Sequence, residues 1–231
     1  MMKKEEREIK RQQKLEAEIA RLDGMRVYER EYASRGVICG IDEVGRGPLA
    51  GPVVAGAVIL PADCQILYLN DSKKLTPRRR ELLYDEIMEK AVSVGLGVVS
   101  QERIDEINIL QATYEAMREA VGKLHPVPDV LLNDAVTIPG LTQLQVPIIK
   151  GDAKSLSIAA ASVVAKVTRD RMMEALDEKY PGYFFASNKG YGSAAHIEAL
   201  KRLGPCPLHR RSFIRNICGG AYEQAQSGSA V

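Results

Sequence analysis

The sequence predicts an α/β protein in which a mixed sheet is flanked by helices. Short apolar runs punctuated by Gly and Pro begin at Gly36, and the first three follow one another in a way that favours an antiparallel meander. Helical and strand-like segments then alternate, which is typical of a mixed sheet. A chain of 231 residues is long enough for one domain with a sizeable core and short appendages.

Residues 1–35 are dense in charge and short of β-branched side chains, so we expect a helical or partly disordered arm. Leu15, Ile19 and Leu22 recur at helical spacing and form a thin apolar stripe. This stripe leaves two interpretations open, a helix that docks on the rest of the protein and a solvated, frayed arm.

Five strands are expected after the arm. The first three are at 37–44, 53–60 and 91–99, and the first two are joined by a turn rich in Gly and Pro at 45–52. Two shorter apolar runs bounded by Pro and Gly, at 129–132 and 144–149, fit two further strands.

A helix is expected at 76–90, because Thr76 can cap it and Pro77 suits its first position. Further helices are expected at 107–124 and 156–180, and the small apolar residues that begin the second of these suit a helix lying close on a sheet face. Short helices over about 181–218 would complete a domain that begins at residue 36. Residues 219–231 are expected to be disordered.

Composition narrows the class of protein. The net charge of +2 permits a polyanionic partner without requiring one. The four cysteines, Cys39, Cys64, Cys206 and Cys218, lie far apart with no Cys-x-x-Cys, so we expect buried free thiols in a reducing cytoplasm. The longest apolar stretches fall short of the roughly 20 residues needed to span a bilayer, and because the N-terminus is charged throughout we expect no signal peptide. A cytoplasmic protein with no membrane partner is expected.

Acidic residues stand where the predicted strands end. Asp42 and Glu43 end the first strand, Asp134 follows the fourth, and Asp152 follows the fifth. Ligands gather at strand ends in α/β sheets, and hard cations such as Mg²⁺ are held by oxygen ligands. Taken singly, these acids could be a helix cap, a turn residue or an ion-pair partner of Arg46. Together they indicate metal-assisted phosphate chemistry.

One difficulty concerns the adjacent pair Asp42 and Glu43. Successive strand residues point to opposite faces of a sheet. These two carboxylates can therefore share a site only if the chain bends or twists at Val44 and Gly45.

Six blocks carry a resemblance to a known family. In order they are IDEVGRGPLAGPVV (41–54), DSKKL (71–75), KGD (150–152), AKVTRDR (165–171), KGYG (189–192) and HRRSF (209–213). They resemble the blocks of bacterial ribonuclease HII, a match that runs from about residue 37 to 215. The resemblance implies a ribonuclease H-like fold with a mixed five-stranded sheet and a helical C-terminal region.

The resemblance also implies an activity. Members of that family are endonucleases that cut the RNA strand of RNA–DNA hybrids and duplex DNA holding a single ribonucleotide. They cleave on the 5′ side of the ribonucleotide, leave 3′-hydroxyl and 5′-phosphate ends, and require Mg²⁺ or Mn²⁺, with two ions expected during catalysis. A role in ribonucleotide removal from DNA and in RNA primer removal follows, and we expect a monomer.

Matched position by position, the family's catalytic and metal-binding carboxylates fall on Asp42, Glu43, Asp134 and Asp152. The resemblance assigns Gly45, Arg46 and Gly47 to reading the 2′-hydroxyl at the RNA–DNA junction through close backbone contact. Only RNA carries that hydroxyl, and a side chain at either glycine would hold the backbone away from it.

Two further substrate contacts follow from the resemblance. Tyr191 would stack on the sugar of the next deoxynucleotide, and Lys73 would contact a phosphate. Without the resemblance, Tyr191 would be interpreted as an ordinary half-buried tyrosine in a glycine-rich loop, and a solvated loop lysine is the alternative for Lys73. The scattered histidines His125, His196 and His209 receive no catalytic role.

The match has two departures, and a basic region accompanies it. Asn188 stands where the family usually has histidine, and Asn133 stands before Asp134 where an apolar residue is commoner. Between residues 189 and 215 six basic residues face a single acid, Glu198, an excess that can follow a phosphate backbone.

Three other functions would require different features of the sequence. A sister ribonuclease H type would need an N-terminal β-containing domain that the arm cannot form. A resolvase of the same superfold would have no reason to combine Gly-Arg-Gly with Lys-Gly-Tyr-Gly. A noncatalytic nucleic-acid-binding module would not need strand-end acids, because these repel phosphate unless metals intervene.

Overall fold

The computed structural model describes residues 2–218, and the tail predicted to be disordered at 219–231 lies outside the described residues. A five-stranded sheet in the order β3-β2-β1-β4-β5 forms its centre. The strands are β1 Ile38–Val44, β2 Val53–Ile59, β3 Ser93–Val99, β4 Val130–Asp134 and β5 Leu144–Ile148. The first three pair antiparallel, whereas β4 lies parallel to β1 and to β5. The predicted meander and the mixed sheet are confirmed.

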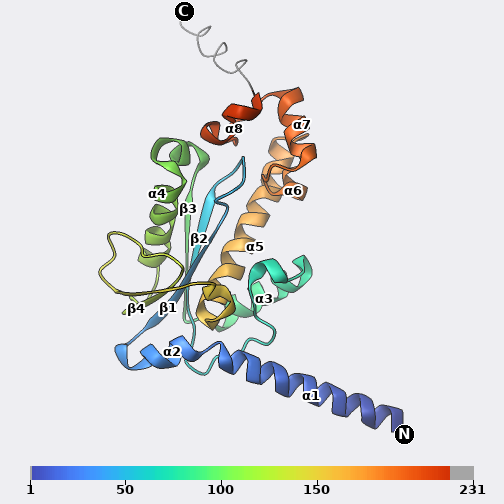
Figure 1. Ribbon diagram of the computed structural model, residues 1–231, viewed down its shortest axis with the longest axis vertical. Coiled ribbons are helices and arrows are strands. Elements are labelled where there is room, and N and C mark those ends of the chain that lie inside the picture. The colour runs from blue at the N-terminus through green and yellow to red at the C-terminus, as the bar shows by residue number, and fades with distance from the viewer. Residues whose placement is uncertain (1, 219–231) are drawn as a thin grey trace, which may run out of the picture.

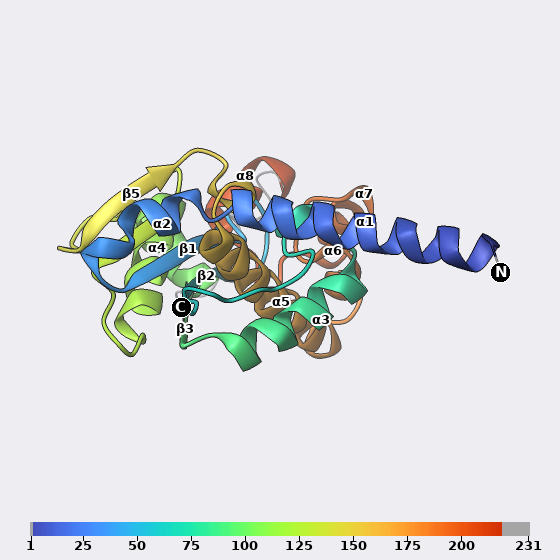
Figure 2. The ribbon, with the colours of Figure 1, turned by 90° about the horizontal axis from the view of Figure 1, so that it is seen from below.

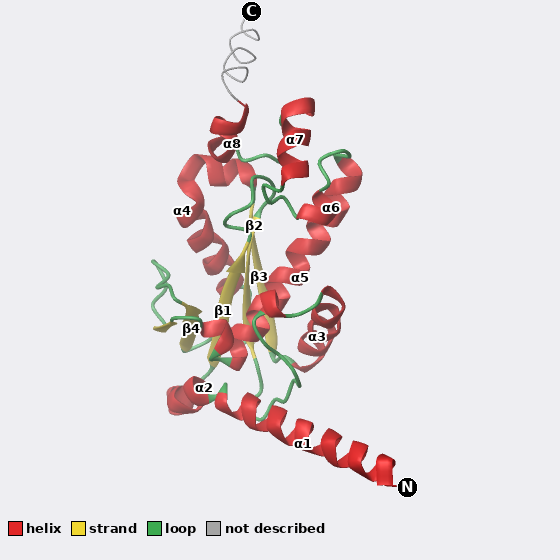
Figure 3. Ribbon diagram, turned by 45° about the vertical axis from the view of Figure 1, so that its right-hand side comes forward, coloured by secondary structure: helices red, strands yellow, loops and turns green. Residues whose placement is uncertain are grey.

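Helices cover both faces of the sheet (Figure 1 and Figure 3). On one face, α4 Gln101–Gly122 packs over a core that includes Ile41, Ala55 and Met117. On the other face, α5 Leu156–Lys179 and α3 Pro77–Lys90 pack over a second core. The small residues at the start of α5 are buried, as a helix lying close on a sheet requires.

The start of α4 was wrong in the sequence-based prediction, which placed it at residue 107. The helix begins at Gln101, where the Ser100 side chain caps it by accepting a hydrogen bond from Arg103 N at 3.3 Å. Asn108 then interrupts the helix with φ 67°. The turns before that interruption are rich in charge and carry few apolar residues, so the apolar pattern of the helix is clear only after it.

The C-terminal region is helical, as predicted, and consists of α6 Phe185–Asn188, α7 Ala194–Leu203 and α8 Arg211–Cys218. It lies beside the turn at 45–52 that joins β1 to β2 (Figure 1). A separate apolar cluster joins Ala50 of this turn to Met173, Phe185 and Leu208. The C-terminal helices therefore support the Gly-Pro turn directly.

The N-terminal arm forms α1 Met2–Gly24 and α2 Val27–Tyr32. Figure 2 shows α1 extending away from the rest of the protein. Ile19 is exposed, whereas Leu22 and Met25 are buried in the core beside α5. The last turns of α1 therefore dock on the rest of the protein, whereas its earlier turns are largely exposed. This outcome lies between the docked helix and the solvated arm that the sequence left open.

The described cysteines are all free thiols, as expected, but only Cys39 and Cys64 are buried, whereas Cys206 and Cys218 are half-buried. Among residues 2–218 no helix combines the length and the apolar character needed to cross a membrane.

Candidate active site

The four predicted carboxylates come from three neighbouring pieces of backbone. Asp42 and Glu43 lie near the end of β1, Asp134 is the last residue of β4, and Asp152 lies in a single turn of 3₁₀ helix that precedes α5. Because β1 and β4 are adjacent and parallel, their carboxyl ends meet at one edge of the sheet. Asp42 and Asp152 are buried.

Charge repulsion within this group shows how close its members are. Burial raises the pKa of Asp42 well above its ordinary value, and the negative charges of Glu43 and Asp134 raise it further. Burial also raises the pKa of Glu43, against the opposing charge of Arg46, and Asp134 adds to the rise. Carboxylates in this state are unfavourable as anions until a cation compensates them.

Asp152 belongs to the same electrostatic group. Burial raises its pKa, and so do the charges of Asp71 and Asp134. Asp71 was not singled out as an acid from the sequence, although it opens the DSKKL block. Its side chain accepts a hydrogen bond from Lys73 N at 2.9 Å and shapes the turn there.

Hydrogen bonds fix two of the carboxylates. Asp42 Oδ1 accepts from the Glu43 backbone N–H at 2.8 Å. Asp134 Oδ1 accepts from the Gly151 N–H at 2.7 Å, which ties the end of β4 to the turn that carries Asp152. Ser162 of α5 also bonds to Asp42 and lies 2.9 Å from the Ser72 hydroxyl. Ser72 and Ser162 are contacts that the sequence did not reveal, because neither is an acid.

The bend expected at Val44 and Gly45 lies at Gly45 alone. Regular pairing continues through Glu43 and Val44, opposite Ala55 and Val54. The chain turns at Gly45, where φ is +95°, a left-handed conformation that suits glycine. Asp42 and Glu43 therefore leave the strand on opposite faces, and their charges interact around the end of β1.

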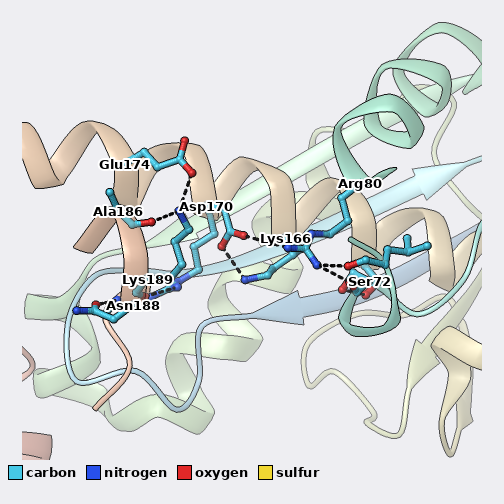
Figure 4. A network of polar contacts seen from close by, with 12 residues as sticks. Ser72, Arg80, Lys166, Asp170, Glu174, Ala186, Asn188 and Lys189 are labelled. Atoms are coloured by element: carbon cyan, nitrogen blue, oxygen red, sulfur yellow. Dashed lines mark hydrogen bonds and ion pairs between the residues drawn. The ribbon is translucent and has the colours of Figure 1, made fainter. Parts of the chain in front are cut away.

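Lys73 lies at this site, as the resemblance implied. Burial acts to lower its pKa, but the charges of Asp42, Asp71 and Asp152 outweigh that effect and raise it. A buried network along α5 holds the turn that carries it (Figure 4). Arg80 lies 3.9 Å from Asp170 and donates to Ser72 O at 2.9 Å and to Leu75 O at 2.8 Å.

The donors of the site are suited to a hard cation, because all of them are carboxylate oxygens. Among residues 2–218, no group of three or more His, Cys, Asp or Glu side chains is already gathered closely enough to hold a metal ion. The geometry therefore shows a repelling cluster of acids at one edge of the sheet.

A second part of the site brings Gly47 and Tyr191 together. Arg46 and Gly47 are exposed beyond the end of β1, and the Tyr191 side chain is 45% exposed. A Cβ added at Gly47 would lie 3.8 Å from Tyr191 Cε1. Two residues separated by 144 positions, both assigned to the substrate by resemblance, thus lie side by side. Arg46 also reaches back to Glu43, at 3.2 Å.

Two buried arginines hold this second part, and neither of these roles was predicted from the sequence. Arg210 donates to the carbonyl oxygens of Gly45, Arg46 and Gly51. Arg169 donates to the carbonyl oxygens of Ala50, Pro52 and Lys189. Both side chains are fully buried. We call this pair of arginines and the carbonyls that they bind the arginine clamp.

The clamp corrects the interpretation of the basic excess between residues 189 and 215. Arg210 faces the protein interior, and Lys189 bonds to Glu174 and to Ala186 O (Figure 4). The side chains of Arg210 and Lys189 therefore bind other groups of the protein. Lys201, Arg202 and Arg215 are exposed on the C-terminal helices.

The two departures from the family pattern have clear structural roles. Asn188 donates to Tyr183 O at 2.7 Å and accepts from Gly190 N at 2.7 Å, which closes the turn before Tyr191. Asn133 is buried and donates to Gln145 Oε1 at 3.1 Å. The hydrogen bonds that the structure records for Asn188 and Asn133 do not involve the four carboxylates.

Comparison with known proteins places this site in context. The family model for Ribonuclease HII matches residues 39–216. A Ribonuclease HII of Lachnoclostridium phytofermentans is 69% identical over 207 residues, covering 90% of this chain and 82% of the relative. The crystal structure of the ribonuclease H2 from Pyrococcus horikoshii has a TM-score of 0.67 at 29% identity, covering 79% of this chain and 97% of that one.

A more distant solved structure shares the fold. Bst-RNase HIII in complex with Mn²⁺ has a TM-score of 0.59 and covers 85% of this chain and 71% of its own. Its 16% identity makes it evidence for the fold alone.

Proposed function

This chain belongs to the ribonuclease HII family and is thus a ribonuclease H, an endonuclease of RNA–DNA hybrids, and from that premise we propose that it also incises duplex DNA at a single embedded ribonucleotide. The cut would fall on the 5′ side of the ribonucleotide and leave 3′-hydroxyl and 5′-phosphate ends. Such an activity would serve ribonucleotide removal from DNA and RNA primer removal, in a cytoplasmic monomer.

One observation carries the proposal: four carboxylates from β1, β4 and the turn before α5 interact electrostatically, and three of them have raised pKa values. A protein does not gain stability from such a group, because each buried anion opposes its neighbours. A divalent cation would remove the repulsion. The oxygen-only donor set fits Mg²⁺ or Mn²⁺. The Mn²⁺ complex of Bst-RNase HIII, which shares the fold, is in keeping with that choice.

Asp42, Glu43, Asp134 and Asp152 would hold the divalent ions, with two ions expected during turnover. When bound, such ions lower the pKa of the attacking water and neutralise the departing 3′ oxygen. The residues of the chain set the geometry around that chemistry. Ser162 and the Glu43 N–H orient Asp42, and the Gly151 N–H orients Asp134. Lys73, held at the same edge, would contact the phosphate.

The position of the cut would be set by the second part of the site. The backbone of Gly45, Arg46 and Gly47 would read the 2′-hydroxyl. Arg46 and Gly47 are exposed, and the absence of a side chain at Gly47 allows close approach there, whereas Gly45 is buried against Arg169. Tyr191, beside Gly47, would stack on the next deoxyribose, where a further 2′-hydroxyl would clash with the ring. The arginine clamp keeps both loops in place from inside the protein.

Cleavage of a labelled duplex that contains one ribonucleotide tests the proposal. An all-DNA duplex of the same sequence is the substrate control, and excess EDTA is the metal control. We expect one incision, 5′ of the ribonucleotide, with 3′-hydroxyl and 5′-phosphate ends, that EDTA abolishes. Incision of the all-DNA duplex at a similar rate, or undiminished incision in EDTA, would refute it.

A further inference from the structure

Two buried histidines lie behind Tyr191, and the proposed mechanism makes no use of them. His196 lies in the first turn of α7 and is completely buried, and His209 precedes α8 and is 3% exposed. Burying two imidazoles is costly unless their nitrogens are hydrogen-bonded. Their partners therefore indicate what they do.

The partners determine where the ring hydrogens lie. His196 Nδ1 is 2.8 Å from Tyr191 O, and a carbonyl can only accept, so His196 carries its hydrogen on Nδ1. His209 Nδ1 is 3.0 Å from Cys206 N, whose N–H can only donate, so this nitrogen offers its lone pair. The Cys206 oxygen and sulfur lie further from His209 Nδ1, at 3.3 Å each.

The contact between the two rings is then fixed as well. Neutral His209 carries its hydrogen on Nε2, which lies 3.1 Å from His196 Nε2. Because the hydrogen of His196 is on Nδ1, its Nε2 is free to accept. The result is a chain of three hydrogen bonds with one donor and one acceptor each, running from Cys206 N through both rings to Tyr191 O. We call this chain the histidine relay.

The surroundings keep both rings neutral. Burial lowers the pKa of His196, and burial together with the facing His196 lowers the pKa of His209 to about 4. Tyr183 and Phe185 pack against the rings, with centroids 5.0 Å from His209 and 5.3 Å from His196. The nearby charged side chains, Glu102, Asp105 and Arg211, line a cavity of about 450 Å³ beside His209.

The relay begins next to the arginine clamp. His209 precedes Arg210, which binds the carbonyls of Gly45 and Arg46, and His196 binds the carbonyl of Tyr191. The adjacent residues His209 and Arg210 thus act on the two loops that meet at Gly47 and Tyr191, Arg210 directly and His209 through His196. We propose that His209 and His196 are positioning residues that hold Tyr191 against Gly47 and thereby set the preference for a lone ribonucleotide. The inference rests on the proposed substrate contact of Tyr191.

Two substitutions at one position separate the relay from simple packing. His196→Asn keeps a donor near the position of Nδ1, so it retains the bond to Tyr191 O and loses the one to His209. His196→Gln keeps a group near the position of Nε2, so it retains the contact with His209 and loses the bond to Tyr191. Both leave a polar amide in the same space, which makes them matched controls for each other.

The readout is the ratio of kcat/KM on the single-ribonucleotide duplex to kcat/KM on an RNA–DNA hybrid. We expect His196→Gln to lower this ratio about tenfold and His196→Asn to stay within about twofold of the wild type. If this ratio is the same in His196→Gln and His196→Asn, whether both stay at the wild-type value or both change, the relay is overturned. If neither variant folds, nitrogen NMR of the wild-type imidazoles decides the test.

Nitrogen NMR of the wild-type imidazoles provides a measurement independent of activity. At pH 7.5 we expect His196 in the Nδ1–H form and His209 in the Nε2–H form, both neutral. The opposite tautomer at either ring would overturn the relay. If wild type fails to incise the single-ribonucleotide duplex while the tautomers are as expected, the proposed function fails and the relay stands.

Discussion

The carboxylate cluster and the arginine clamp both bury like charges, and burial together with Arg169 lowers the pKa of Arg210 to about 9. They differ in how the buried charge is compensated. In the cluster, like charges face one another, and the pKa values of Asp42, Glu43 and Asp152 are raised. In the clamp, every guanidinium nitrogen of Arg210 and Arg169 donates to at least one backbone carbonyl. We propose that a bound cation compensates the cluster, whereas the guanidinium donors of the clamp are satisfied within the folded chain.

This difference separates two tasks. An uncompensated cluster is costly for stability and is explained by chemistry, because perturbed carboxylates gather at functional sites. A saturated clamp is explained by geometry, because it fixes loops that lie far apart in sequence. Substitutions in the cluster should therefore remove turnover with little loss of stability, and substitutions in the clamp should reduce stability and positional choice.

The largest effect is expected from Asp42→Asn. Turnover should fall by roughly three orders of magnitude or more, because the residue would hold the ions that activate water. The metal-free melting temperature should stay the same or rise, since the substitution removes a buried anion whose pKa is raised. Single-turnover cleavage and thermal unfolding in EDTA measure the two effects.

Asp85→Asn, an exposed acid on α3, is the matched control for that substitution and should retain wild-type turnover. Wild-type cleavage by Asp42→Asn in the presence of metal would contradict the role given to the cluster.

Arg210→Met should cause the largest loss of stability, about 3 kcal/mol, because it removes the donor to three carbonyl groups, of which those of Gly45 and Gly51 are buried. For a domain of this size that corresponds to a fall of roughly 10 °C in melting temperature. Arg215→Met removes an exposed cation from the same helix region and should change the melting temperature little. Similar melting temperatures for the two variants would show that the clamp does not stabilise the fold.

Acid should weaken the relay next to the clamp. The pKa of His209 is lowered from 6.5 to about 4, so between these values the unfolded chain binds a proton that the folded chain does not. The stabilisation that comes from neutral His209 is therefore fully present above pH 6.5. As the pH falls toward 4 this contribution is lost, which lowers the free energy of unfolding by about 3 kcal/mol. The carboxyls with raised pKa values act in the opposite direction as the pH falls.

Comparison with His209→Gln isolates the histidine contribution, because the carboxyls are unchanged in that variant. Chemical denaturation at pH 7.5 and at pH 4.5 should show a smaller loss of stability in His209→Gln than in the wild type. An equal or larger loss in the variant would argue against a buried neutral His209.

The smallest effect should come from Tyr191→Ala, which removes an exposed ring and leaves the clamp intact. The preference for a lone ribonucleotide over an RNA–DNA hybrid should fall about tenfold, and affinity for all-DNA duplex should change by about twofold or less. Measured kcat/KM values and equilibrium binding give the two numbers. Equal losses in the preference for a lone ribonucleotide and in the affinity for all-DNA duplex would count against the stacking role of Tyr191.

The sequence was sufficient for the strands and for the acids at their ends, because short apolar runs bounded by Gly and Pro and the carboxylates that follow them are local signals. It was not sufficient for the clamp. Arg210 lies 165 residues from Gly45, and nothing in a basic stretch tells a buried arginine from one that contacts phosphate. The relay was hidden for the same reason, since His196, His209 and Tyr191 acquire their roles only when three loops meet.

Other misses also have physical causes. The start of α4 was misplaced because a side-chain cap and charged turns precede the interruption at Asn108. The bend expected at Val44 and Gly45 was half right: backbone pairing persists through Val44, and the chain turns at Gly45, where glycine readily adopts the positive φ.

The division between cutting and choosing is tested most directly by the binding of Asp42→Asn to two DNA duplexes that differ only in one 2′-hydroxyl. With Mg²⁺ present and cleavage abolished, we expect this variant to bind the single-ribonucleotide duplex more tightly than the all-DNA duplex, by about the same factor as a wild-type protein kept inactive with Ca²⁺. Equal affinity of Asp42→Asn for both duplexes, while the Ca²⁺-bound wild type still discriminates, would show that the carboxylates also choose the site and would contradict the account.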